Sequence, residues 1–182
     1  EKVLSFKKPI IISTGMLNHS GVLNLIKLIK KRNFPMKKVF LLHCVSDYPV
    51  EDKEANLISI KYLRDKFKIN TGYSDHTIGI EASIMAVAYG AKIIEKHFTI
   101  DKNYSNFRDH KLSADPKEMS KLVKCVRRSS IMDGTYTKKI SKNEKKNFKF
   151  ARRSFYAKTQ INKGEKITKD KIKFVRPFNP LS

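Results

Sequence analysis

Residues 69–97 read INTGYSDHTIGIEASIMAVAYGAKIIEKH and contain one complete strand–helix–strand unit. The segment 69–73 has the pattern of a buried strand, and 91–94 forms a second short apolar run. Between them, residues 80–89 are small and apolar nearly all round, as in a buried helix, and Gly90 can end that helix. Two strands connected through a helix normally run parallel in one sheet. The unit therefore predicts a parallel sheet.

The same pattern occurs twice more upstream, where residues 9–12 and 39–42 also read as buried strands. Apolar side chains at helical spacing follow each run: Val22, Leu25, Ile26 and Ile29 after the first, and Leu57, Ile60, Leu63 and Phe67 after the second. Asn56 is a plausible N-cap of the second helix. Asp115 and Pro116 predict the start of a further helix after the fourth strand. This β-α-β-α-β-α-β-α order predicts an α/β fold with a parallel sheet flanked by helices.

The composition combines enough apolar residues for a core with a strong positive charge. The 182 residues include 39 Lys and Arg against 17 Asp and Glu, a formal net charge of +22, and 40% are hydrophobic. Residues 1–130 hold 24 basic and 13 acidic residues, and 131–182 hold 15 and 4, so each part carries +11. A basic tail can bind nucleic acid. Scattered lysines favour a solvated surface instead, because base readout relies on arginine and aromatic residues. Nucleic-acid binding stays as the weaker alternative.

The chain lacks the features of a membrane or secreted protein. No apolar run approaches the roughly 18 residues of a membrane span, and no secretory signal is visible. Cys44 and Cys125 are too few for a disulfide framework, which favours a cytoplasmic location. Because the chain starts at Glu1 and ends in a loop-like stretch, we expect it to be a segment of a longer protein.

A change of pattern divides the chain into three parts. Residues 1–130 hold the strand and helix units, and 131–147 are polar and charged, which we interpret as a linker. Residues 148–182 contain short strand-like stretches around a turn at 162–165. The last part therefore predicts a small β-rich domain.

Compact polar segments follow the four predicted strands: Ser13-Thr14-Gly15, His43-Cys44-Val45-Ser46, Ser74-Asp75-His76 and Glu95-Lys96-His97. Functional residues of parallel α/β sheets gather at the carboxyl ends of the strands. Strand residues two apart share a face, so Ser74 and His76 point the same way, as do Glu95 and His97, while Asp75 and Lys96 point the opposite way.

Two histidines on neighbouring strands would lie about 5 Å apart laterally. With a carboxylate nearby, His76 and His97 could share a divalent ion and leave positions for water or substrate. A structural hydrogen bond is the competing interpretation, and the spacing alone leaves both open. For His43 we favour the structural interpretation, with one hydrogen bond at the edge of the core. We expect His19 in a loop before a helix. A tight turn at Gly15 could let a backbone N–H meet a phosphate.

Four segments resemble the sialic acid synthases: KPIIISTGM (8–16), LHCVSDYP (42–49), GYSDHTIG (72–79) and IEKHFT (94–99). The resemblance continues through Arg108-Asp109-His110 and Ala151-Arg152-Arg153-Ser154 to Arg176-Pro177, in the family's order and spacing. It implies the C-terminal half, strands five to eight, of a (β/α)8 TIM barrel, followed by part of a small SAF (antifreeze-like) domain. It also implies condensation of phosphoenolpyruvate with an N-acyl amino sugar, commonly N-acetylmannosamine, to give a nonulosonic acid and phosphate.

The resemblance also implies a role for individual residues. His76 and His97 match two ligands of a divalent metal ion (Mn or Mg), and Glu95 matches the carboxylate beside the metal and the substrate. Together these three are the expected catalytic residues. The remaining matches bind substrate: Ser13, Ser46 and Ser74 at the phosphate of phosphoenolpyruvate, and Tyr48 and Asp109 at the acceptor sugar. The lysines that neutralise the phosphate in the family come from the earlier barrel strands.

Several alternatives remain open within this resemblance. The sequence Asn106-Phe107-Arg108-Asp109-His110 replaces the Pro-Gly-Pro-Asp-His stretch of many members, which leaves the sugar preference open between sialic, legionaminic and pseudaminic acid synthesis. His43 favours the first two, since pseudaminate synthases tend to carry Lys there. The complete protein is expected to be a domain-swapped homodimer, because the family's SAF domain covers the partner's barrel. The 182 residues alone are expected to show no turnover and poor solubility, because a half-barrel exposes sheet edges.

Overall fold

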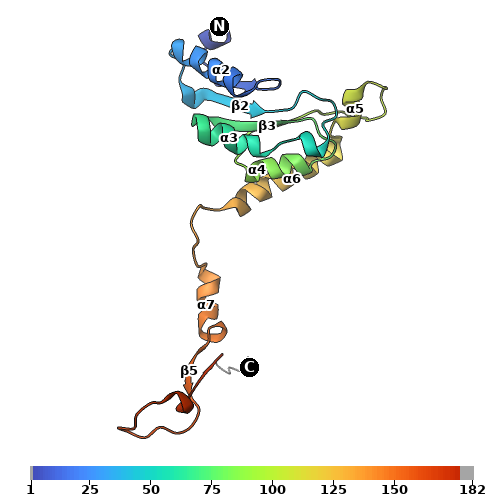
Figure 1. Cartoon of the computed structure of the whole chain (residues 1–182). Helices are drawn as coiled ribbons and strands as arrows, with labels where there is room; N and C mark the ends of the chain where they lie inside the picture. The colour runs from blue at the N-terminus through green and yellow to red at the C-terminus, as the bar shows by residue number, and fades with distance from the viewer. Residues whose placement is uncertain (1, 177–182) are drawn as a thin grey trace. The chain divides into compact units, whose positions relative to one another are not determined.

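The computed structural model describes residues 2–176 and divides the chain into two compact units, residues 1–134 and 135–182 (Figure 1). The first unit contains a parallel sheet of four strands in the order β1-β2-β3-β4. These strands are β1 (Ile10–Ser13), β2 (Val39–His43), β3 (Asn70–Asp75) and β4 (Ile94–Lys96). The predicted α/β fold with a parallel sheet is therefore confirmed.

Helices connect the strands in the predicted alternation. They are α2 (His19–Lys31), α3 (Ile58–Phe67), α4 (Glu81–Ala88) and, after β4, α5 (Arg108–Leu112) and α6 (Pro116–Asp133). A short α1 (Lys2–Ser5) precedes β1, and single 3₁₀ turns cover Met36–Lys38 and Asp52–Glu54. Helices α4 and α6 pack against each other (Figure 1). Within residues 2–176, every helix is too short or too polar to cross a membrane.

The helix starts show how local sequence signals work here. Asp115 caps α6 through a reciprocal capping box with Glu118, and Pro116 occupies the first turn, as predicted. Helix α2 begins at His19, because the side chain of Asn18 accepts a hydrogen bond from Gly21 N and caps the helix there. His19 therefore lies in the helix and not in a loop. Asn56 does not cap α3: its amide donates to Ser59 Oγ at 2.9 Å, and Leu57 occupies the cap position.

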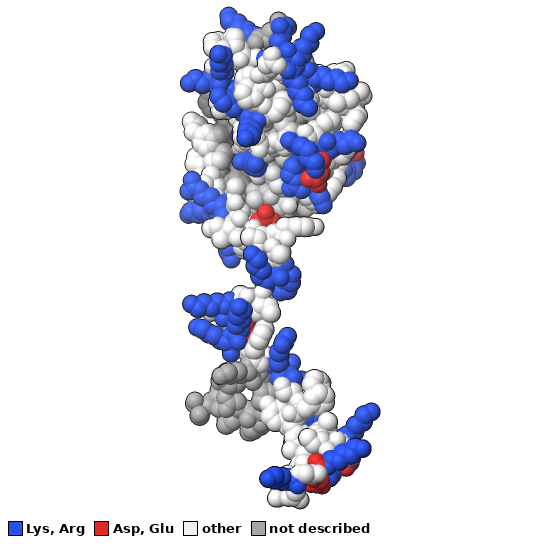
Figure 2. All heavy atoms as spheres, turned by 90° about the vertical axis from the view of Figure 1, so that its left-hand side faces the viewer, with Lys and Arg blue, Asp and Glu red and all other residues white. Residues whose placement is uncertain are grey.

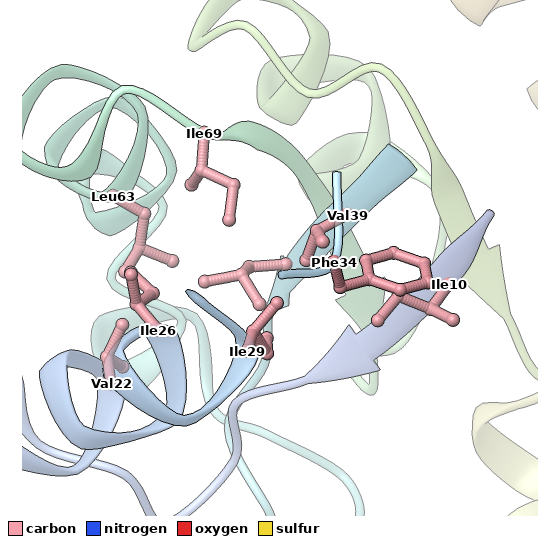
Figure 3. Packing of buried hydrophobic residues seen from close by; sticks show 9 residues of the cluster. Ile10, Val22, Ile26, Ile29, Phe34, Val39, Leu63 and Ile69 are labelled. Carbon is pink, nitrogen blue, oxygen red and sulfur yellow. The ribbon is translucent and has the colours of Figure 1, made fainter. Parts of the chain in front are cut away.

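The core of the first unit forms where the strands begin. Its buried residues are Ile10, Val22, Ile26, Ile29, Phe34, Val39, Leu41, Leu63 and Ile69. Figure 3 shows these side chains approaching one another from the helices and from the strands. The helical spacing of apolar residues read from the sequence thus identifies the buried face of α2.

Two strand ends lie further along the chain than predicted. Strand β3 continues through Ser74 and Asp75, and β4 contains Glu95 and Lys96, so these four polar residues belong to the sheet itself. The reason is that they satisfy one another across the two strands. Such pairing is invisible to a pattern that ends a strand at its last apolar residue.

A close approach of two strands explains the glycine in β3. A Cβ atom on Gly72 would lie 2.6 Å from the carbonyl oxygen of Ile93 and 2.4 Å from Leu42 Cδ2. Real Cβ atoms do not tolerate such distances to backbone, so a side chain there would push β3 and β4 apart. The glycine thus permits the close approach of the two strands that His76 and His97 directly follow.

The second unit contains one helix and an antiparallel strand pair. Helix α7 (Lys142–Ala151) begins with a capping box between Ser141 and Glu144. Strand β5 (Ser154–Ala157) pairs with β6 (Ile172–Val175), which follows a 3₁₀ turn at Lys169–Lys171, and the rings of Phe155 and Phe174 are 4.9 Å apart. The expected strand-like stretches are confirmed.

The expected linker is partly helical. Helix α6 extends to Asp133 and α7 begins at Lys142, so the irregular chain between the two helices is shorter than residues 131–147. The capping box at Ser141 is the local signal that starts α7 within this polar stretch. Pro177, which the family resemblance includes, lies outside the described residues.

Candidate active site

A pocket of about 320 Å³ lies at the carboxyl ends of the four parallel strands. Its lining residues are Ser13, Gly15, Cys44, Ser46, Tyr48, Ser74, His76, Glu95 and His97. These include every substrate, catalytic and metal residue expected from the sequence except Asp109. Asp109 reaches the pocket's edge from α5, where its Oδ2 atom lies 3.8 Å from His97 Nδ1. The structure therefore brings all eight predicted residues together.

The two histidine rings lie side by side at the end of β3 and β4. Their centroids are 5.4 Å apart and the rings are nearly perpendicular, in line with the lateral separation expected from the spacing. His76 Nδ1 lies 2.7 Å from the carbonyl oxygen of Val45. Because a carbonyl only accepts, Nδ1 is the donor and Nε2 keeps its lone pair. The Nε2 atom faces the pocket and lies 3.4 Å from Ser74 Oγ.

The expectation that strand residues two apart share a face is confirmed on both sides of the sheet. On the pocket side, Ser74 Oγ donates a 2.6 Å hydrogen bond to Glu95 Oε1. On the opposite side, Asp75 and Lys96 form an ion pair with 3.3 Å between Oδ2 and Nζ. Burial lowers the pKa of Lys96, and the Asp75 carboxylate opposes that effect.

Tyr48 covers the histidine pair with its ring. The Tyr48 ring centroid lies 4.2 Å from that of His76 and 5.8 Å from that of His97. The guanidinium of Arg108 lies 5.0 Å from the centroid of the Tyr48 ring, within the range of a cation–π contact. Arg108 therefore brings a positive charge to the pocket. No role for Arg108 was predicted from the sequence.

Gly15 and Cys44 complete the wall beside Ser46. A Cβ on Gly15 would lie 2.3 Å from Ser46 Oγ and 3.1 Å from Cys44 Sγ, so the absence of a side chain there makes room for both. Burial raises the pKa of the Cys44 thiol, which keeps it protonated. Cys44 could have been found from its spacing, because it lies two residues before Ser46 and two residues after the buried Leu42.

The other three histidines, His19, His43 and His110, are not among the residues that line the pocket. His43 Nε2 lies 2.9 Å from the carbonyl oxygen of Ala55, and its ring stacks on Tyr73. This single structural hydrogen bond at the core edge confirms the interpretation favoured for His43. His19 contacts the Tyr62 hydroxyl through Nδ1 at 2.5 Å and stacks on Phe67.

His76, His97 and Asp109 are the residues of this region that could hold a divalent metal ion. His76 offers the Nε2 lone pair. Asp109 Oδ2 lies 3.8 Å from His97 Nδ1, while its Oδ1 is buried, accepts no hydrogen bond from the described residues and lies 3.7 Å from Arg108 Nε. Residues 2–176 contain no preformed cluster of three or more His, Cys, Asp or Glu, so water or substrate would supply the other ligands.

A parallel βα sheet with a polar pocket across its strand ends is the arrangement that α/β barrel enzymes share. Residues 1–138 match the model of the NeuB family, and the chain belongs to this family. The resemblance to the sialic acid synthases is thereby confirmed.

Relatives and solved structures support the same assignment. Over 182 residues the chain is 41% identical to the N,N'-diacetyllegionaminic acid synthase of Campylobacter jejuni, covering all of this chain and 54% of that protein. It is 34% identical to the N-acetylneuraminate-9-phosphate synthase of Mus musculus, covering 94% of this chain and 47% of that protein. The N-acetylneuraminic acid synthetase structure from Leptospira borgpetersenii matches with a TM-score of 0.74 and 36% identity, covering 81% of this chain and 50% of that one. The chain spans about half the length of these relatives.

Proposed function

We propose that this chain is the catalytic C-terminal part of a nonulosonic acid synthase, which condenses phosphoenolpyruvate with an N-acyl amino sugar and releases phosphate. The observation that carries the proposal is the pocket itself: it combines two facing imidazoles, a carboxylate and three serine hydroxyls on four strand ends. Membership of the NeuB family supports the reaction class. N-acetylmannosamine and the sugars that lead to legionaminic or pseudaminic acid are the candidate acceptors.

His76 and His97 would hold the divalent ion (Mn or Mg), with Asp109 and Glu95 close by. When bound, this ion acts as a Lewis acid on the aldehyde of the open-chain sugar. Ser13 and Ser46 would orient the phosphate of phosphoenolpyruvate with their hydroxyl groups. Ser74 would do so by turning its hydroxyl from Glu95 to the phosphate. Serines do not neutralise a phosphate, so cationic groups from the remainder of the protein complete that site.

Glu95 and Tyr48 have complementary roles in this proposal. Glu95 already accepts a hydrogen bond from Ser74, which leaves its second carboxylate oxygen available for water or the sugar hydroxyls. Tyr48, together with Asp109, would contact the acceptor sugar. The Tyr48 ring also excludes water from one side of His76, because the two rings are in contact. Exclusion of water strengthens every electrostatic interaction within the pocket.

The finer architecture belongs to the same proposal. Strands β1 to β4 would be barrel strands five to eight, and the β5–β6 pair would begin a SAF domain. The complete protein would work in the cytoplasm as a domain-swapped homodimer, in which each SAF domain covers the other subunit's pocket. The free state of both cysteines supports the cytoplasmic location.

The distribution of charge favours an enzyme over a nucleic-acid-binding module. Figure 2 shows Lys and Arg side chains spread over both units on the face that it displays, and not concentrated in one groove. Scattered lysines provide general attraction for anions and no base readout. An anionic substrate would benefit from the same field.

The proposal is tested by phosphate release in the complete protein that contains this segment. The assay supplies phosphoenolpyruvate with each candidate sugar, in the presence of Mn²⁺ or Mg²⁺ and then of a chelator. We expect sugar-dependent release that the chelator abolishes. His76→Ala should reduce the rate at least about a hundredfold, because a catalytic metal contributes several kcal/mol and 1.4 kcal/mol equals a factor of ten.

His19→Ala is the matched control, because His19 lies on α2 outside the pocket and should leave the rate unchanged. The isolated 182 residues should release no phosphate. Equal rates for His76→Ala and the unmodified protein would reject the metal assignment. Salt-sensitive binding of nucleic acid without any phosphate release would favour the binding module instead.

A further inference from the structure

Two side-chain contacts connect β3 and β4 immediately before the histidines, one on each face of the sheet. The strands pair in parallel with Ser74 opposite Glu95 and Asp75 opposite Lys96. The Ser74–Glu95 hydrogen bond lies on the pocket face. The Asp75–Lys96 ion pair lies on the helix-covered face, outside the pocket, and has no role in the proposed chemistry.

The pairing of the two strands ends at Asp75 and Lys96, one residue before the histidines. Beyond that point the backbones turn to other partners. The carbonyl oxygen of His76 accepts from Val50 N at 2.9 Å, and that of His97 accepts from Ala114 N at 2.8 Å. The Asp75–Lys96 pair is therefore the last link between the two strands before the two imidazoles.

Lys96 also holds the chain on both sides of His76. Its Nζ atom lies 3.3 Å from Asp75 Oδ2 and donates to the carbonyl oxygen of Thr77 at 2.5 Å. Asp75 is fixed in turn, because its Oδ1 accepts from Thr77 N and Thr77 Oγ1, and its Oδ2 accepts from Ser83 Oγ on α4. This network connects the residue before His76, the residue after it and the residue before His97.

The burial of this pair argues for a geometric role. The side chains of Lys96 and Asp75 are 1% and 0% exposed. A buried ion pair is often no more stabilising than apolar side chains of similar volume, since both charges lose their hydration. A rigid, fully bonded network can nevertheless fix the position of the atoms attached to it.

We propose that Asp75 and Lys96 are positioning residues that set the separation and orientation of the His76 and His97 rings. The inference rests on the proposed function, in which these rings hold the divalent ion. Groups that orient metal ligands affect metal affinity although they never touch the metal. Asp75 and Lys96 would do so through the backbone, from the face of the sheet opposite the pocket.

The test uses Co²⁺ alone as the probe in the complete protein, without substrates. Cobalt absorbs visible light according to the geometry of its ligands, so one titration gives both an affinity and a spectrum. The main variant is the double substitution Asp75→Asn with Lys96→Met, which removes both charges and leaves no buried charge without a partner. We expect its Co²⁺ affinity to fall about 10- to 100-fold with a shifted absorption band, while its Tm stays close to that of the unmodified protein.

Thr77→Val is the second variant, and it covers the case in which the double variant does not fold. It removes only the Thr77 Oγ1 bond to Asp75 and keeps the shape of the side chain. We expect a smaller, severalfold loss of Co²⁺ affinity. Asp65→Asn is the control, because Asp65 pairs with Arg64 at an exposed position on α3. It should change neither the affinity nor the spectrum.

Each result separates the inference from the proposed function. The positioning role alone is overturned if the Co²⁺ band depends on the histidines but the double variant keeps both the Co²⁺ affinity and the shape of the band. If the double variant is unfolded, the same result in Thr77→Val overturns it. If His76→Ala leaves the Co²⁺ band of the otherwise unmodified protein unchanged, both the proposed metal site and the positioning role are overturned.

Discussion

The two ends of the β1–β4 sheet are built from different kinds of residue. Where the strands begin, Ile10, Val39 and Ile69 are buried against the apolar face of α2 and the residue Leu63 of α3. Where the strands finish, hydroxyl, imidazole and carboxylate groups surround a pocket. The apolar end gains stability by burying surface, whereas the polar end forgoes that gain and holds reactive groups in fixed positions. Substitutions at the two ends should therefore have separable effects on stability and on chemistry.

The apolar end should show the largest effect on stability. Leu41 is fully buried in the core cluster, and Leu41→Ala should lower the free energy of unfolding by about 2–5 kcal/mol, because it removes apolar contacts and leaves a cavity. Urea titration measures this loss, and the rate of phosphate release per folded molecule should stay unchanged. Leu28→Ala on the exposed side of α2 is the control and should shift stability by less than about 0.5 kcal/mol. A Leu41 variant of unchanged stability would contradict the division between the two ends.

The polar end should respond in substrate binding before it responds in stability. Gly15→Ala places a Cβ 2.3 Å from Ser46 Oγ, so the hydroxyl must rotate away. Losing one hydrogen bond to a charged phosphate costs roughly 1.5 kcal/mol, so KM for phosphoenolpyruvate should rise about tenfold or more. Steady-state kinetics and a thermal melt measure both quantities.

Gly21→Ala in the first turn of α2 is the matched glycine control, since it lies outside the pocket and should leave KM unchanged. A changed KM together with a Tm near its original value in Gly15→Ala would confirm that the polar end serves substrate binding and not stability. A large loss of Tm with an unchanged KM would show that Gly15 serves the fold instead.

The smallest effect is expected at His43, which lies between the two ends. Burial lowers its pKa from the ordinary value of 6.5, and the hydrogen bond to Ala55 opposes this in part. Because the folded-state pKa is depressed, the unfolded chain takes up a proton at higher pH than the folded chain. The contribution of His43 to stability is therefore present above about pH 6.5 and lost as the pH falls through the folded-state pKa.

Urea titrations between about pH 7 and pH 5 should show this loss, at no more than about 1.4 kcal/mol per pH unit for one proton. His43→Asn should show a shallower dependence on pH. An identical slope in the His43 variant would assign the acid sensitivity to other groups.

Much of the sheet could be predicted because its signals are local. Apolar runs identified β1, β2 and β3, whereas β4 shares only Ile94 with the predicted run 91–94. The helical spacing of Val22, Ile26 and Ile29 identified the buried face of α2. The alternation of side chains along a strand placed Ser74 and His76 on one face and Asp75 on the other, as observed. The capping box at Asp115 is equally local.

The remaining features depend on residues distant in sequence. Strand β4 includes Lys96 because Asp75, which is 21 positions earlier, provides its partner. Asn56 has the chemistry of an N-cap, but its side chain bonds to Ser59 instead. Arg108 reaches the pocket only because α5 folds back toward Tyr48. No pattern confined to neighbouring residues contains this information.

The central position of β3 has a consequence for motion in the molecule. Strand β3 pairs with β2 on one side and β4 on the other, and five of its six residues are buried. To open locally, it must break pairing on both sides, which requires nearly the free energy of global unfolding. The described strand residues of β5 and β6, in contrast, include no buried side chain. Because His76 directly follows β3, we expect the pocket to keep its geometry through fluctuations that separate β5 from β6.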